Sequence, residues 1–126
     1  MTHLLIVGIG GFIGSVLRYL LSGLAHRWVQ DAFPVGTLLV NVLGCIALGM
    51  IMSLVEYRQL FGVQTRLFLT IGVLGGFTTF STFGYETFVL LRESRYLHAL
   101  LSVAGNVVVG TAAVAAGWML AKLAVA

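Results

Sequence analysis

The stretch GGFTTFSTFGYE, residues 75–86, decides how this chain folds. It lies inside a long apolar run, yet it combines hydroxyl side chains, aromatic rings, glycines and one carboxylate. Paired glycines weaken a helix, and clustered Thr and Ser side chains offer the backbone competing hydrogen bonds. Irregular backbone at membrane depth persists only where protein buries it or where it lines a water-filled cavity. The stretch therefore predicts a broken membrane helix beside an ion pathway.

The composition of the whole chain is typical of a membrane protein. Of its 126 residues, 60% are apolar and 9% are charged, whereas globular domains carry about 25% charged residues. The net charge of +3 is spread along the chain, which indicates no nucleic-acid partner. One cysteine, three separate histidines and dispersed carboxylates give neither a metal cluster nor a catalytic triad, so we expect no enzyme.

Four apolar runs are long enough to cross a bilayer: residues 4–25, 32–55, 67–91 and 99–121. Short loops join them, so we predict a single all-α transmembrane domain over residues 1–126 with both termini on the same side. The third run is longer than a bilayer core requires, and either tilt or a break can absorb the excess; Gly75-Gly76 followed by two threonines favours a break. Glycines in the first two spans suggest close helix packing.

The orientation of a membrane protein follows the Lys and Arg content of its short loops. On the side of the termini lie Arg58, Arg66 and Lys122; on the other lie Arg27, Arg92, Arg95 and, if its side chain reaches that interface, Arg18. This near balance predicts insertion in both orientations and an antiparallel dimer whose two-fold axis lies in the membrane plane. Partners that impose one orientation remain the alternative.

The chemistry of the central stretch suits a small anion. Phe80 and Phe83 share one helical face, and the positive edges of their rings can meet a dehydrated anion without trapping it. Neutral hydrogen-bond donors are added by the amide of Asn41 and by the hydroxyls at residues 78, 79, 81 and 82. Such donors bind an anion strongly enough for it to enter and weakly enough for it to leave. Ordinary apolar packing is the alternative for the two rings.

Several other polar residues can each be interpreted in two ways. Asn41 either joins two helices or faces a pathway, because an unpaired amide in lipid is costly. Arg18 either extends to the interface or attracts anions at a pore mouth. Glu86 is either an interfacial acid or a proton-coupling group. Ser102, Asn106 and Gly110 recur every four residues and so share a face of the fourth span.

The run from Gly75 to Phe83, followed by Glu86, resembles the signature of the Fluc/CrcB family of fluoride channels. Arg18 after the glycine-rich first span and the segment GTLLVN at residues 36–41 are similar to further family motifs. The resemblance covers essentially the whole chain. It implies a dual-topology, antiparallel homodimer in the cell (inner) membrane, with two pores that export fluoride passively and protect the cell from fluoride toxicity.

The same resemblance implies roles for individual residues. Phe80 and Phe83 would offer ring edges to fluoride, and Asn41 an amide donor. The hydroxyl track would contain Ser81 and Thr82, with Glu86 towards one mouth and Arg18 near a vestibule. Carbonyls of Gly75 and Thr78 from both subunits would hold a structural sodium ion at the dimer interface, with no organic cofactor. In the fourth span, where relatives often carry Ser or Thr, the pore positions would be Ser102 and Asn106.

Two other functions compete with a channel. A proton-coupled exporter of small organic cations, resembling the small multidrug transporters, would need an acid in the first span, where this chain has Arg18 instead. A structural or accessory subunit would need a partner and would conduct nothing alone. Flux through the purified protein separates these hypotheses.

Overall fold

The computed structural model describes residues 1–125 and is helical almost throughout. Helix α1 (Thr2–Trp28) is followed by α2 (Val35–Arg58). We predicted that the second span starts at residue 32, but α2 begins three residues later, after Pro34. The reason is steric, since the proline ring disfavours helical dihedrals at the preceding Phe33.

The third span consists of four helical segments. They are α3 (Val63–Arg66), the wider π-type turn η1 (Leu67–Leu74), α4 (Gly75–Phe77) and α5 (Phe80–Arg92). Between α4 and α5 the backbone is extended: φ and ψ are −85° and 159° at Thr78, and −151° and 113° at Thr79. The helical hydrogen bonds are therefore interrupted at these two threonines.

The fourth span keeps helical dihedrals along its length. Helix α6 (Tyr96–Ala104) continues through a second π-type turn, η2 (Gly105–Val109), into α7 (Gly110–Val125). Such wider turns are usually short insertions within α-helices and are frequent near functional sites. Here η2 contains Asn106, one of the predicted pore residues.

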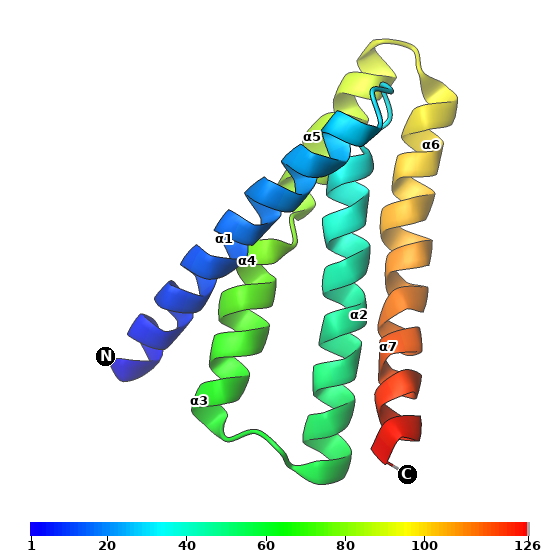
Figure 1. The fold of residues 1–126 in the computed structure, drawn as a ribbon. Helices are drawn as coiled ribbons and strands as arrows, with labels where there is room; N and C mark the ends of the chain where they lie inside the picture. Colours follow the sequence, from blue (N-terminus) through cyan, green and yellow to red (C-terminus); the bar gives the residue numbers. More distant parts are fainter. Residues whose placement is uncertain (126) are drawn as a thin grey trace.

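Four helical stretches are long and apolar enough to cross a membrane: Thr2–Trp28, Val35–Arg58, Val63–Arg92 and Tyr96–Val125. Figure 1 shows both termini at the end of the molecule where α2 turns into α3, while the other two connections lie at the opposite end. The prediction of a multi-pass, all-helical membrane protein is confirmed in this form.

The spans pack mainly in two pairs, α1 along η1 and α4, and α2 along α7 (Figure 1). Glycines make both approaches possible. A methyl group at Gly14 would collide with the carbonyl oxygen of Val73, and one at Gly117 would collide with the carbonyl oxygen of Ile46. In lipid, where apolar burial gives little drive for association, such close backbone contact holds helices together.

Candidate functional site

Asn41 of α2 binds the backbone at the interruption of the third span. Its Oδ1 accepts a hydrogen bond of 2.8 Å from the Thr79 amide, and its Nδ2 donates one of 3.1 Å to the Thr79 carbonyl. The Thr79 amide lacks the acceptor it would have in a continuous helix, and an unpaired amide in an apolar environment is costly. The Asn41 side chain therefore replaces that acceptor and gives the Thr79 carbonyl an additional donor.

Arg18 of α1 supports the same interruption from the other side. Its Nε donates a hydrogen bond of 3.0 Å to the carbonyl oxygen of Gly76, in the last turn of α4. The side chain is half-buried and points into the helix pair rather than towards an end of the molecule. Arg18 is thus held at the interruption, a contact that neither of the two sequence interpretations included.

Thr79 also starts α5. Its Oγ1 accepts a hydrogen bond of 3.3 Å from the Thr82 amide, the usual interaction of an N-terminal cap, and donates one of 2.9 Å to the Thr82 hydroxyl. Sequence reasoning assigned no individual role to Thr79. The signal was present, since a threonine directly before the first apolar residue of a helical pattern often marks a helix start.

Because of these contacts, two backbone carbonyl groups lack the amide donors that they would have in a continuous helix. In a continuous helix the Thr79 amide would bind the Gly75 carbonyl, and the Thr82 amide would bind the Thr78 carbonyl. Both amides instead bind side-chain oxygens, of Asn41 and of Thr79 respectively. Freed neutral carbonyls at a break are the groups that hold sodium in broken transporter helices, so Gly75 and Thr78 fit such an ion.

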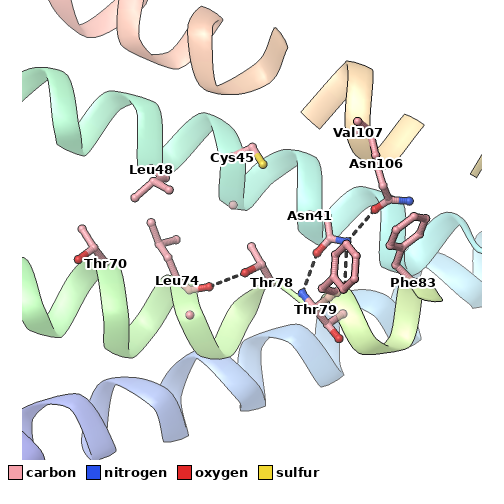
Figure 2. Close-up of a pocket in the computed structure, with 13 residues that line it drawn as sticks. Asn41, Cys45, Leu48, Thr70, Leu74, Thr78, Thr79, Phe83, Asn106 and Val107 are labelled. Atoms are coloured by element: carbon pink, nitrogen blue, oxygen red, sulfur yellow. Dashed lines mark hydrogen bonds between the residues drawn. The ribbon is translucent and has the colours of Figure 1, made fainter. Parts of the chain in front are cut away.

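A cavity of about 390 Å³ lies beside the interruption (Figure 2). Six of the eleven predicted site residues line it: Asn41, Gly75, Thr78, Phe80, Phe83 and Asn106. They come from α2, from α4 and α5 with the break between them, and from η2. Thr70 and Cys45, to which the sequence analysis gave no functional role, also face it.

Phe80 and Phe83 form a pair within the chain. Their ring centroids are 5.4 Å apart and their planes are inclined by 71°, so an edge of one ring meets the face of the other. Phe83 is buried, with 7% of its surface exposed, whereas Phe80 is 80% exposed. Phe83 therefore forms a buried wall of the cavity, whereas the ring of Phe80 is exposed at the surface of the single chain.

A chain of hydrogen bonds leads from the interruption into the fourth span. Nδ2 of Asn41 donates to Oδ1 of Asn106 at 2.7 Å, and Nδ2 of Asn106 donates to the carbonyl of Ser102 at 2.9 Å. The hydroxyl of Ser102, which is fully buried, lies 3.1 Å from that of Thr87. Ser102 is thus joined to Asn106 but does not line the cavity.

The remaining predicted residues lie outside the cavity. Oε1 of Glu86 accepts a hydrogen bond of 2.9 Å from the hydroxyl of Thr37, which is buried in α2. Thr82 is engaged with Thr79, and Ser81 is exposed. Thr37, the partner of Glu86, was not among the predicted site residues, although it lies within the GTLLVN segment at residues 36–41.

The family model described as "CrcB-like protein, Camphor Resistance (CrcB)" matches residues 5–118. The chain is 49% identical over 120 residues to "Fluoride-specific ion channel FluC 1" of Methanosarcina acetivorans, covering 93% of this chain and 88% of the relative. It is 45% identical over 122 residues to "Fluoride-specific ion channel FluC" of Geobacter sulfurreducens, covering 97% and 98%. A third relative of that name, from Chlorobaculum tepidum, is 46% identical over 123 residues.

Proposed function

The chain belongs to the CrcB family, and from this premise we propose that it is a fluoride-selective channel, a passive pore through which fluoride leaves the cell. The relatives named above are fluoride-specific ion channels by name and match nearly the full chain. Such a pore needs no energy source, because fluoride moves down its own gradient, and it protects the cell from fluoride toxicity.

The observation that carries this proposal is the chemistry of the cavity at the interruption. Within residues 1–125 its lining contains two phenylalanine rings, two side-chain amides and hydroxyls, but no charged side chain. Positive ring edges and neutral donors attract a dehydrated anion, yet they release it more readily than Lys or Arg would. Fluoride, which is small and accepts strong hydrogen bonds, gains most from such donors.

The assembly that we propose is an antiparallel homodimer of chains with opposite topology. The charge balance between the two ends supports it, and so does the 80% exposed surface of Phe80 beside the cavity. Such a dimer would bring two interruptions of the third span together near the membrane midplane. Two pores would result, and the location would be the inner membrane of the cell.

A structural sodium ion at the crossing point completes this proposal. The carbonyls of Gly75 and Thr78, freed as described above, would hold it together with the same carbonyls of the second copy. A bound cation would offset the partial negative charges that converge there. Ser81, Thr82 and Glu86 would extend the fluoride path beyond the phenylalanines, and Arg18 would keep α4 in place below it.

The test is a flux assay on the purified protein. Reconstituted into liposomes loaded with potassium fluoride, it should release fluoride to an electrode once valinomycin balances the charge, and it should release chloride far more slowly. Liposomes without protein provide the leak rate. Equal rates for the two anions, or fluoride release at the leak rate, would contradict the proposal.

A further inference from the structure

The carboxylate of Glu86 in α5 has a partner for one of its two oxygens. Its Oε1 accepts the hydrogen bond of 2.9 Å from the hydroxyl of Thr37, but its Oε2 is buried and has no hydrogen-bond partner within residues 1–125. A buried acceptor without a donor is costly, and more so when it carries a charge. A second partner for Glu86 is therefore expected.

The end of α1 packs against the turn of α2 that contains Thr37. A methyl carbon at Gly36 would lie 2.8 Å from the carbonyl oxygen of Ser22, so the backbones of α1 and α2 are in close contact there. His26 follows Ser22 by four residues and therefore lies on the same face of α1, one turn further on. Figure 1 shows this end of α1, the start of α2 and α5 at the same end of the molecule.

Among residues 1–125, His26 is the ionisable side chain whose charge reaches Glu86. On the α2 side the carboxylate meets Thr37, and the face of α6 that packs against α5 carries the uncharged Ala99 and Ser102. His26 is exposed, so its imidazole can exchange protons with water. The other charged or titratable side chains at this end of the molecule are Arg27, Asp31, Arg92, Glu93, Arg95 and His98.

We propose that His26 pairs with Glu86 at one mouth of the pore and makes the fluoride flux depend on pH. A carboxylate at a mouth repels fluoride, whereas an imidazolium beside it offsets that charge. Histidine is the side chain whose charge ordinarily changes between about pH 5 and 8, so proton binding to His26 should speed fluoride passage. His26 acts through Glu86 and is a positioning residue. This role rests on the proposed channel function.

Fluoride flux at two pH values tests this pairing. In liposomes with equal pH on both sides, wild-type flux should be about threefold or more higher near pH 5.5 than near pH 8, the effect of one charge about 6 Å from the anion in water. His26→Gln should match the wild type near pH 8 but lack the rise near pH 5.5. His26→Lys, which stays charged over this range, should conduct at the faster rate at both values. Protein-free liposomes at each pH measure the leak of hydrogen fluoride.

His98→Gln is the matched control for His26→Gln. His98 lies at the same end of the molecule but beside the ring of Phe33, with the ring centroids 6.3 Å apart, so this variant should keep the pH dependence of the wild type. Gel filtration must show the same assembly size for all variants. The proposal is overturned if wild-type flux does not rise at the lower pH, or if His26→Gln keeps the rise. Wild-type protein that does not prefer fluoride over chloride refutes the channel function instead.

Thermal unfolding in detergent tests the pair without any measurement of flux. Near pH 8, His26→Lys brings a permanent charge to the carboxylate of Glu86 and should raise the midpoint of unfolding by about 3 °C. In a Glu86→Gln background the same substitution has no carboxylate to pair with and should not raise the midpoint. Such non-additivity measures the coupling between the two residues. Equal shifts in both backgrounds would overturn the proposal, even in a channel that selects fluoride.

Discussion

At the residue scale, the aromatic pair is the feature by which the proposed anion path would differ from an ordinary apolar pocket. Phe80 and Phe83 meet edge to face, so the quadrupole of each ring has a defined direction at the cavity. An aliphatic side chain of similar bulk would fill the same space without any positive edge. The role of the rings can therefore be tested while the packing is kept nearly constant.

We expect Phe83→Ile and Phe80→Ile each to lower fluoride flux by about fivefold or more, because an aromatic contact of about 1 kcal/mol is lost at the barrier. The measurement is the liposome efflux assay. Phe88→Ile is the matched control, since Phe88 lies on the same helix, is exposed and does not line the cavity. If all three variants conducted alike, the rings would serve only for packing.

Arg18 offers a second test at this scale, because its hydrogen bond satisfies a backbone carbonyl. Arg18→Met keeps much of the apolar stem but leaves the Gly76 carbonyl without this donor. We expect a loss of about 1–3 kcal/mol in stability, the usual cost of an unsatisfied buried group. Thermal unfolding in detergent, followed by circular dichroism, measures it.

Arg92→Met is the control for Arg18→Met, since Arg92 is an exposed arginine at the end of α5. It should change the midpoint of unfolding little. Equal effects of the two substitutions would mean that charge, rather than the contact with Gly76, accounts for the result.

At the scale of the helices, the contact between α1 and the third span depends on glycine. A methyl group at Gly14 would also approach the Phe77 amide to 2.9 Å, so the substitution pushes directly on the helix that leads into the interruption. The packing of α1 therefore constrains the backbone next to the break. Backbone atoms cannot move aside as a flexible side chain can.

Gly14→Ala should destabilise the protein by about 1–3 kcal/mol through overpacking. Gly23→Ala is an internal control in the same helix, because a methyl group there meets no atom within 4 Å. It should be neutral or stabilising by about 0.5–1 kcal/mol, since alanine favours a helix over glycine. Unfolding midpoints of both variants in the same detergent give the comparison. A stabilised Gly14→Ala protein would contradict this packing.

At the scale of the whole molecule, the structure sharpens the charge balance between the two ends. Arg18 is engaged with Gly76 inside the helix pair, so it does not count for either end. The end with the termini then carries Arg58, Arg66 and Lys122, and the opposite end carries Arg27, Arg92 and Arg95. Each end therefore has three basic residues. Without a difference in Lys and Arg content, nothing in the loops favours one direction of insertion.

Dual topology can be measured with a single engineered cysteine. In a Cys45→Ala background, Gln30→Cys and Leu60→Cys place thiols in exposed connections at opposite ends of the molecule. In intact cells, a membrane-impermeant maleimide should label about half of each variant from outside, as expected when loop charges give no preference. Complete labelling of one variant with no labelling of the other would show a single orientation.

Much of the fold follows from local properties that the sequence displays directly. Four apolar runs predicted four spans, and four long apolar helices are found whose ends all lie within a few residues of the predicted ones, with Pro34 accounting for the later start of α2. Gly75-Gly76 followed by two threonines predicted a break, and the extended dihedrals lie at those threonines. Both predictions needed only neighbouring residues, because hydropathy and helix propensity act within a few turns.

The partners of the polar side chains required the tertiary structure. Asn41 was predicted as a pore donor, yet its contacts with Thr79 and Asn106 join residues 38 and 65 positions apart in the sequence. Arg18 and Gly76 are 58 positions apart, and Thr37 and Glu86 are 49. No periodicity encodes such pairs, because they depend on how the helices pack and rotate against one another.

By itself, then, the sequence determined a four-span membrane protein, the place of its interrupted helix and, through its motifs, its family. Only the tertiary structure decided which polar groups hold that interruption, namely Asn41 at Thr79 and Arg18 at Gly76. The physical reason is that hydrophobicity and backbone propensity are local, whereas the pairing of donors with acceptors is settled only once distant helices are in contact.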